Sequence, residues 1–548
     1  MALRLLNDFR TNFFSFQFHF LGHDISLLPT LLVIFVTSRV IKLLKGIHAV
    51  NYLPGFRVPF QPLAIPGAIL PTTSWNFGPS AHWNWRSTVY KTFGSEIFSV
   101  IPFLVGAPSI YTSSIEVARQ VVSGEQKGSS RSFQKSEFAN RVLIKWGMNL
   151  VGALDGHVWR KHRRVVGPAY ELVWTETLNT YRQMEAGEGW DAKDTIDVPS
   201  VGRLTTKLAL LVIAKCGFGF SFDWSAPPTG PDGKMSVQKA LSVLSKSHLV
   251  ALMAPDWVRY LPLPGFAQIR EAFDQFSGFM QREFEARVAE VRNEEQSADE
   301  RIDAFTMLVR ANEQQTGKLC LNNQEVIGNV FIMLFAGHET TAHTLETTLA
   351  LLALHQDLQN EVYEQIVSVV GYDRDPKFED YANLDKVLHA FYEALRLFPT
   401  AYLLIREAAE DTVLQVPNPV GQEGSTPYPV PKGTRVIIDM ISLHYNERYF
   451  ADPTAFKPSR WSGTSSESEA LFSFSVGPRA CIGRKFALTE AVAFLTMLLR
   501  DWRVEPAFKE DESREAWRER VMGTPDLVLT LSVKEAPVRL TRRRPGRG

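Results

Sequence analysis

The chain has 548 residues, of which 45% are hydrophobic and 22% charged, and its 59 Lys and Arg residues balance 59 Asp and Glu residues. This composition is typical of a globular protein with an extensive core. The zero net charge gives no support to nucleic-acid binding. The three cysteines contain no CxxC pair, which argues against a disulfide scaffold and against a zinc site.

The N-terminal segment, residues 1–45, is predicted to hold a transmembrane anchor. Residues 25–38 carry no charge, and three basic residues follow between positions 39 and 45. This run is shorter than the roughly 20 residues of a full span, but residues 25–44 reach that length if the basic side chains snorkel. A cleaved signal peptide or an interfacial helix are the alternatives. No small-residue cleavage site follows, and the basic residues favour a cytoplasmic main domain.

The remaining chain is predicted to form one domain between two simpler segments. Five prolines between positions 46 and 75 indicate a stiff spacer, because proline fixes φ and blocks helix formation. Residues 76–535 contain no further linker or repeat and are expected to form the catalytic domain. Residues 536–548 are basic and are expected to be a flexible tail.

The domain is predicted to be mostly α-helical with a minor β-sheet, which is the α+β class. Residues 326–354 are apolar nearly all round in their first half, as in a long buried helix. Amphipathic helices are expected at residues 357–370, 384–397 and 485–499. Short strands are expected at residues 97–102, 109–112, 413–416, 435–439 and 527–533.

Two sequence patterns place an arginine on one helix face with a second side chain. Trp159 and Arg163 are four residues apart, and Glu393 and Arg396 are three apart. Taken alone, each pattern predicts only an amphipathic helix or a surface ion pair, which contributes little to stability. Any functional interpretation must come from the rest of the chain.

The long apolar helix contains the sequence AGHETT, which begins at Ala336. Gly337 weakens the helix locally, and Thr340 can compete for backbone hydrogen bonds, so a kink or a widened turn is expected. The apolar residues before this sequence argue against a helix face that is exposed to solvent. The helix therefore predicts an interior groove that contains polar groups.

The segment FSFSVGPRACIG contains Cys481 and leads directly into a helix. Backbone N–H groups of the loop and the positive end of the helix favour a thiolate at Cys481. Gly477 and Gly483 let the backbone approach a flat cofactor closely, Arg479 can pair with a propionate, and Phe474 can shield the sulfur from water. These residue types predict that Cys481 is the axial ligand of a haem iron. The alternative is a turn with an ordinary buried cysteine.

This loop resembles the haem-binding signature of the cytochrome P-450 superfamily, the haem-thiolate monooxygenases. AGHETT is similar to the family's central-helix motif. The pairs formed by Trp159 with Arg163 and Glu393 with Arg396, and the segment FKPSRW that contains Arg460, match further motifs in the family's order. The chain is most similar in style to fungal microsomal members of secondary metabolism.

The resemblance implies the cytochrome P-450 fold around haem b, with Cys481 as the metal ligand. Trp159, Arg163 and Arg406 would join Arg479 in binding the propionates. Buried Glu393, Arg396 and Arg460 would form a structural triad whose members must be fully hydrogen-bonded, since buried charges are otherwise costly.

On the other side of the haem, Ala336 and Gly337 would line the groove in which O2 binds. Thr340 would donate a hydrogen bond to the bound oxygen, and Glu339 would relay protons as the second catalytic residue. His338 and Glu339 stand where other residues are frequent in the family, which can alter the proton relay.

The resemblance also implies partners. Electrons would come from NADPH through a separate reductase, the NADPH–cytochrome P-450 reductase, with cytochrome b5 as a further donor. Arg484 and Lys485 add positive charge to the docking face. The predicted anchor would place the protein at the endoplasmic reticulum membrane as a single-pass protein with a cytoplasmic catalytic domain.

The substrate is expected to be an apolar small molecule, with terpenoid secondary metabolites as the leading class in the family. By analogy, its pocket would draw on residues 133–146, 249–255, 331–335, 400–404 and 523–527. The alternatives are a polyketide, aromatic or xenobiotic substrate, a haem-thiolate isomerase or dehydratase that inserts no oxygen, or a haem sensor. Thr340 and Glu339 favour oxygen activation over the last two.

Overall fold

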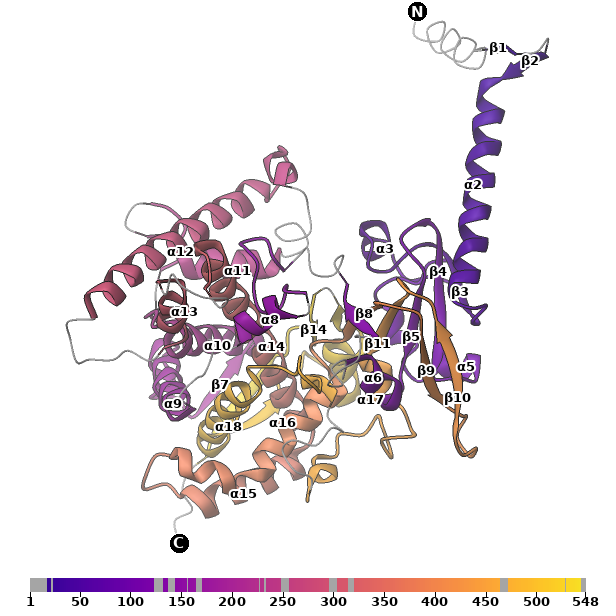
Figure 1. Ribbon diagram of the computed structural model, residues 1–548. Coiled ribbons are helices and arrows are strands. Elements are labelled where there is room, and N and C mark those ends of the chain that lie inside the picture. The colour runs from indigo at the N-terminus through magenta and orange to yellow at the C-terminus, as the bar shows by residue number, and fades with distance from the viewer. Residues whose placement is uncertain are drawn as a thin grey trace, which may run out of the picture.

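A computed structural model gives the fold of the chain (Figure 1). The structure describes residues 17–20, 23–122, 132–136, 143–154, 156–163, 170–225, 227–230, 233–247, 256–294, 303–313, 320–463, 472–527 and 529–543. Helices gather on one side around the long helix α14 (Asn323–Leu354), and a sheet region lies on the other side (Figure 1). The fold is mostly helical with small sheets, as the sequence predicts.

The helical body is built from long helices whose apolar faces form one core. Its members are α9 (Tyr170–Gly187), α10 (Val201–Phe218), α11 (Val237–Lys246), α12 (Phe266–Glu294), α13 (Ala304–Glu313), α15 (Gln356–Val370), α16 (Asp385–Leu397) and α18 (Arg484–Asp501). The short helix α8 (His157–Arg163) packs apart from this core, where Trp159 meets Leu150 and Ala153. Shorter helices are α3 (Ile65–Ile69), α4 (Ala81–Asn84), α5 (Val89–Phe93), α6 (Ile115–Val122), α17 (Met440–His444) and α19 (Arg514–Arg518).

Helix α14 crosses the centre of this body. A capping box starts it: the side chain of Asn322 accepts from the Glu325 N–H, and the Glu325 carboxylate accepts from the Asn322 N–H. The helix then continues without a break to Leu354, and the Thr340 hydroxyl donates to the Ala336 carbonyl at 2.9 Å. The helix is therefore not interrupted at the expected kink. The Thr340 hydroxyl adds a hydrogen bond to this turn of the helix.

The six-stranded sheet has the order β3-β4-β5-β11-β8-β6. Its strands are β3 (Gly55–Phe60), β4 (Ile97–Val105), β5 (Ser109–Thr112), β6 (Phe133–Lys135), β8 (Leu403–Ala408) and β11 (Arg435–Asp439). Strand β11 pairs parallel with β5 and antiparallel with β8. The edge strand β6 pairs with β8 in a register that puts Lys135 opposite Arg406. The hairpin of β9 (Thr412–Pro417) and β10 (Ser425–Val430) lies beside this sheet (Figure 1).

A second sheet corrects the expected boundary of the C-terminal tail. Strand β15 (Val538–Arg542) pairs with β12 (Trp502–Pro506) on one side and with β7 (Thr195–Val198) on the other. Val538 and Leu540 are buried, so alternate residues of this basic segment belong to the core. Part of the expected flexible tail is thus an ordered strand, and residues 544–548 lie outside the described residues.

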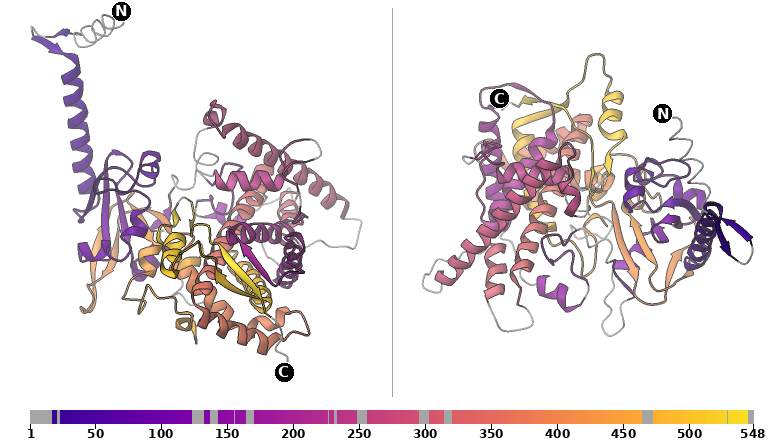
Figure 2. Two further views of the ribbon diagram at one scale, coloured as in Figure 1. Left: turned by 180° about the vertical axis from the view of Figure 1, so that it is seen from behind. Right: turned by 90° about the horizontal axis from the view of Figure 1, so that it is seen from above.

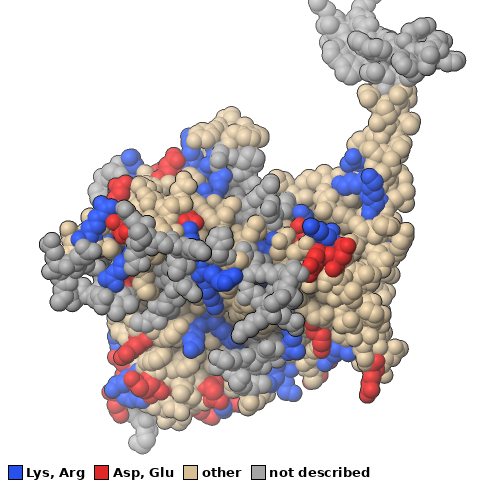
Figure 3. All heavy atoms as spheres, in the orientation of Figure 1, with Lys and Arg blue, Asp and Glu red and all other residues tan. Residues whose placement is uncertain are grey.

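Helix α2 (Leu27–Ala49) projects away from the rest of the molecule (Figure 1, and the left view of Figure 2). Its outer half carries no charged side chain, and basic residues appear where it meets the body (Figure 3). There, Lys42 donates to the Leu104 carbonyl at 2.8 Å, which fixes the base of α2 to β4. Within the described ranges, no helix is long and apolar enough to cross a membrane.

Candidate haem site

The cysteine loop is a tight turn between η5 (Phe472–Phe474) and α18. The Cys481 N–H donates to the Phe474 carbonyl at 2.8 Å and closes the turn. Gly477 has φ of 74°, a left-handed conformation that favours glycine, whereas Gly483 has φ of −85°, which any residue adopts. The two glycines thus differ. The backbone conformation at position 477 favours glycine, whereas at position 483 an added Cβ would lie 3.9 Å from the Cys481 sulfur.

The thiol of Cys481 is accessible although protein surrounds it. Burial raises its pKa, and the Gly483 N–H and the charges of Arg163 and Arg484 oppose that shift. The loop therefore favours a thiolate only in part. A coordinated metal ion would supply the rest, because a thiol that binds a metal loses its proton.

One face of α14 is open as well. Ala336 is exposed and Thr340 is half-buried, although most of their neighbours in the helix are buried. The two residues are four apart and share a face. Gly337 has a further feature, which the sequence did not reveal: a Cβ there would lie 3.1 Å from Ile213 of α10. We therefore assign Gly337 to the close packing of α10 against α14.

A cluster of cations, formed by buried Arg406 and by half-buried Lys135 and Arg479, lies between the sheet and the cysteine loop. Burial and the charge of Arg479 lower the pKa of Arg406 to about 10. Burial and the charges of both arginines lower the pKa of Lys135 well below its ordinary value. Among the described residues, Lys135 and Arg406 have no acidic partner, and like charges opposite each other on paired strands destabilise a sheet.

These cations fit a haem. Its two propionates would neutralise Lys135 and Arg406, which have no acidic partner among the described residues, and the exposed Cys481 would face the iron. Lys135 belongs to this cluster and was missed from the sequence, because it lies in a three-residue strand with no pattern of its own. Its only signal is its register opposite Arg406, which requires the sheet.

Helix α8 brings Trp159 and Arg163 to the same place. The Arg479 guanidinium stacks on the Trp159 ring at 4.6 Å from the centroid and donates to the Ala153 carbonyl at 3.0 Å. Arg163 donates to the Ala480 carbonyl at 3.1 Å. Trp159 and Arg163 of α8 therefore meet Arg479 and Cys481 of the cysteine loop, and Arg406 of β8, a third segment, interacts with Arg479. Phe474 contacts the Arg484 guanidinium, 5.4 Å from its ring centroid.

The predicted triad also comes together: Glu393 and Arg396 are fully buried, and Arg460 is mostly buried. Arg396 makes two bonds to Glu393, of 2.9 and 2.8 Å, and Arg460 donates to Glu393 at 2.8 Å. Arg396 donates further to the carbonyls of His444 and Pro453, each at 2.8 Å. Since every charge has several partners, the cost of burying the triad is offset.

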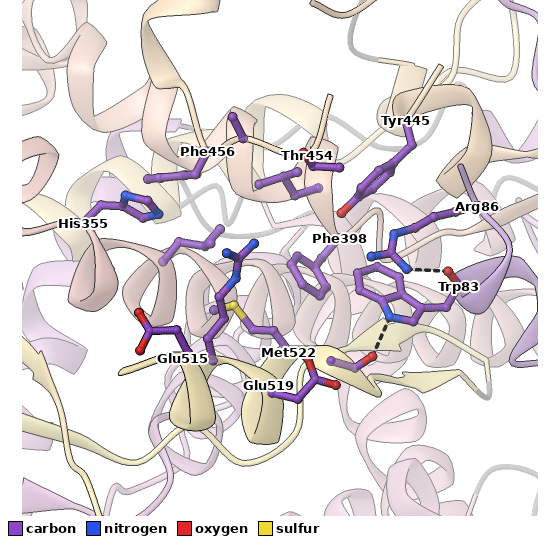
Figure 4. Close-up of a pocket in the computed structure, with 15 residues that line it drawn as sticks. Trp83, Arg86, His355, Phe398, Tyr445, Thr454, Phe456, Glu515, Glu519 and Met522 are labelled. Carbon is purple, nitrogen blue, oxygen red and sulfur yellow. Dashed lines mark hydrogen bonds between the residues drawn. The ribbon is translucent and has the colours of Figure 1, made fainter. Parts of the chain in front are cut away.

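A separate hollow of about 560 Å³ opens beside the end of α16 (Figure 4). Trp83, Arg86, Phe398, Tyr445 and Glu519 line it with other residues, and the Trp83 indole donates to the Gly523 carbonyl at 2.8 Å. None of the predicted cofactor or catalytic residues lines this hollow. It is therefore distinct from the haem site.

An exposed cysteine beside Lys135 and Arg406, two cations without an acidic partner among the described residues, is an arrangement that fits a haem-thiolate protein. Residues 86–531 match the family model described as Cytochrome P450, and the chain belongs to this family. It is a cytochrome P450 monooxygenase, an oxidoreductase of class EC 1.14. Members of the family hold a haem through a cysteine thiolate and generally need a reductase partner.

Known relatives cover most of the chain. Cytochrome P450 monooxygenase 124 of Postia placenta is 32% identical over 94% of this chain and 100% of its own. Cyclooctat-9-en-7-ol 5-monooxygenase of Streptomyces melanosporofaciens is 29% identical over 71% of this chain and 79% of its own. The crystal structure of the cytochrome P450DA heme domain shares the fold, with a TM-score of 0.66 at 22% identity over 89% of this chain and 98% of that one.

Proposed function

We propose that this monooxygenase holds haem b through Cys481 and oxidises an apolar small molecule, in most cases by hydroxylation. The observation that carries the proposal is the exposed Cys481 next to half-buried Lys135 and buried Arg406, two cations without an acidic partner in the described chain. A bound haem would activate O2 and transfer one of its atoms to the substrate.

The residues around the haem would divide the work. Trp159, Arg163, Arg406, Arg479 and Lys135 would hold the propionates by charge and hydrogen bonds. Phe474, Gly477 and Gly483 would shape the cysteine loop, and Ala336 would leave room on the opposite side. Thr340 would offer its hydroxyl to bound oxygen, with Glu339 as the neighbouring acid.

We propose a terpenoid-like secondary metabolite as the substrate. Aromatic side chains support an apolar pocket: Trp146 packs on Phe331 with 4.1 Å between ring centroids, and Phe335 stacks on Phe331 at 5.6 Å. One relative is named for a cyclooctat-9-en-7-ol, an alkenol. The expected pocket residues 137–142 and 249–255 lie outside the described residues, so the polar groups that fix the substrate's orientation are to be found by experiment.

NADPH–cytochrome P450 reductase is the proposed electron donor, with cytochrome b5 as an accessory donor. Lys485 is exposed and Arg484 half-exposed at the start of α18, next to the cysteine loop. Positive charge at this place suits a negatively charged docking face. Charge reversal at Lys485 should slow electron transfer from the reductase. Added salt should also slow this transfer.

We further propose that residues 1–45 attach the protein to the endoplasmic reticulum membrane. Leu32, Val33 and Ile34 of α2 are each about 60% exposed, which is unusual for apolar residues in succession and marks a surface for lipid. Deletion of residues 1–45 should release the protein from microsomes during a carbonate wash. Release of the full chain by the same wash would contradict a firm attachment.

The haem assignment is tested with Cys481→Ala in the full chain. The wild type should show the red-shifted Soret band of a ferrous–CO complex with a thiolate ligand, and Cys481→Ala should lose it. Retention of that band in the variant would overturn the role of Cys481. Incubation with reductase, NADPH and a panel of terpenoids should then give oxygen-dependent products, and Thr340→Ala should divert electrons to peroxide.

A further inference from the structure

Two histidines on α14 flank Glu339, and their surroundings differ. His338 is 1% exposed, while His343, one turn farther along the helix on the side of Glu339, is half-buried. Glu339 itself is 7% exposed. A buried acid that moves protons needs a connection to solvent, and these two histidines are the candidates for that connection.

His338 has both ring nitrogens engaged. Its Nδ1 lies 2.7 Å from the Leu334 carbonyl, which can only accept, so Nδ1 carries the hydrogen. Its Nε2 lies 3.3 Å from the Ser245 hydroxyl of α11, and burial lowers its pKa. His338 is therefore a neutral link between α14 and α11, and it has no spare proton to give to Glu339.

His343 reaches Glu339 through one hydroxyl. Thr530 donates to Oε1 of Glu339 at 2.6 Å, and its Oγ lies 3.4 Å from Nδ1 of His343. Because the single Thr530 hydrogen is used toward Glu339, the contact with His343 requires a hydrogen on Nδ1. The three groups thus form a directed chain, with Nδ1–H donating to Thr530 and Thr530 donating to Glu339.

The position of Thr530 is fixed by the residue that follows it. Leu531, the first residue of β14 (Leu531–Ser532), is fully buried, and its N–H donates to the Thr400 carbonyl at 2.9 Å. At the far end of the chain, Oε2 of Glu339 is buried and has no hydrogen-bond partner within the described part of the chain. Glu339 can therefore receive a proton on Oε1 and still has a free oxygen toward the interior.

We propose that His343 and Thr530 carry protons from solvent to Glu339, as positioning and relay residues of the monooxygenase reaction. The inference rests on the proposed role of Glu339 and deepens it. In the step, the His343 imidazolium gives its Nδ1 proton to the Thr530 oxygen, and the Thr530 hydroxyl gives its own proton to Glu339. His343 is then neutral, Glu339 is a neutral acid, and solvent returns one proton to His343.

Other titratable groups lie close to this chain. His338 interacts with Glu339 from the same helix. Glu346, three residues after His343, faces α10 and the C-terminal segment, where Asp526 and Glu535 are its charged neighbours. Because Glu339 has these titratable neighbours, the experiment must separate the contribution of Glu339 to the protonation of His343 from theirs.

The protonation of His343 can be measured without turnover. The haem-loaded full chain is treated with diethylpyrocarbonate over a range of pH, and modification of His343 is followed by peptide mass spectrometry. We expect Glu339→Gln to lower the pH midpoint of His343 by about one unit, because the nearby carboxylate stabilises the imidazolium. Thr530→Val should lower it too, and Thr530→Ser should keep it. His355, at the end of the same helix, serves as the control and should not change.

Turnover gives the second readout. With reductase, NADPH and a ligand that shifts the haem spectrum, Thr530→Val and His343→Gln should release at least about threefold more peroxide per NADPH, and Thr530→Ser should restore the wild-type value. In the wild type, the peroxide released per NADPH should rise as pH increases through the midpoint of His343. An unchanged His343 midpoint in both Glu339→Gln and Thr530→Val, or an unchanged peroxide share, would overturn the relay. Absence of the red-shifted ferrous–CO band in the wild type would instead count against the proposed function.

Discussion

The indole N–H of Trp461 donates to Oε2 of Glu393 at 3.0 Å, and both side chains are buried. Oε1 of Glu393 accepts from Arg396, from Arg460 and from the Lys457 N–H. Trp461 is thus the fourth side chain of the buried triad. A tryptophan at this position adds a neutral donor to a carboxylate that must be fully satisfied to remain charged in the core.

We expect Trp461→Phe to destabilise the protein by about 1 to 3 kcal/mol, because it leaves one lobe of a buried carboxylate short of a donor. The measurement is urea unfolding of the haem-loaded chain, followed by fluorescence and by the haem absorbance. Trp257→Phe is the matched control, since Trp257 is 64% exposed and its replacement should change little. Equal stability of the two variants would mean that Glu393 does not need this bond.

Lys135 should act in opposite directions on the apoprotein and the holoprotein. Lys135→Met removes a buried charge from beside Arg406 and Arg479, so the haem-free chain should become more stable. It also removes a partner of the propionates, so haem should dissociate roughly tenfold faster. Transfer of haem to apomyoglobin and thermal unfolding of the apoprotein measure the two effects. Lys91→Met, at an exposed ion pair with Glu447, is the control. If Lys135→Met stabilises both the apoprotein and the bound haem, or destabilises both, Lys135 is not a propionate ligand.

Gly337 should not tolerate a methyl group. In Gly337→Ala, the new Cβ would meet Ile213 at 3.1 Å, which forces α10 and α14 apart or distorts Ile213 at a cost of about 1 to 3 kcal/mol. Ile213→Val in the same chain should recover part of that cost if packing is the cause. Unfolding free energies of the two single variants and the double variant give the coupling. A coupling near zero would assign Gly337 to the haem groove alone.

Where the sequence succeeded, local pattern and tertiary environment agreed. The strands at 109–112 and 435–439 have the predicted bounds, since each is a short run rich in β-branched or aromatic residues. Strand β10 was missed because Pro427 and Pro429 are typical of non-strand segments, and only a sheet edge accepts them. The strand at Val538–Arg542 was hidden by its basic residues: Arg539 lies on the solvent side, and half-buried Arg542 lies over the Trp502 ring, 4.2 Å from its centroid.

The candidate site also contains residues that the sequence predicted and residues that it did not. Its motif residues were predicted because their types and spacing are specific. Lys135, Trp461, Thr530 and His343 were missed because each acts through a contact between distant segments: the bonds to Glu393 and Glu339 span 68 and 191 residues. A local pattern carries no information about such contacts before the fold is known.

The stability of the protein should depend on pH through Glu346. Burial raises the pKa of this carboxyl to about 8, against about 4.5 in an unfolded chain, while Oε1 accepts from the N–H groups of Gly202 at 3.1 Å and Ala536 at 3.3 Å. The folded state therefore keeps a proton that the unfolded chain releases. This contribution is fully present below pH 4.5 and is lost as pH rises toward about 8.

Glu346→Gln should remove this dependence, because the amide keeps the accepting oxygen and cannot ionise. We expect the variant to match the wild type near the lower end of this range, at about pH 5, and to exceed its unfolding free energy at about pH 8.5 by on the order of 1 to 3 kcal/mol. Urea unfolding at the two pH values measures the difference, with Glu447→Gln at the surface as the control. A wild type that gains stability relative to Glu346→Gln as pH rises would show that the carboxylate is ionised in the folded protein, held by the Gly202 and Ala536 N–H groups.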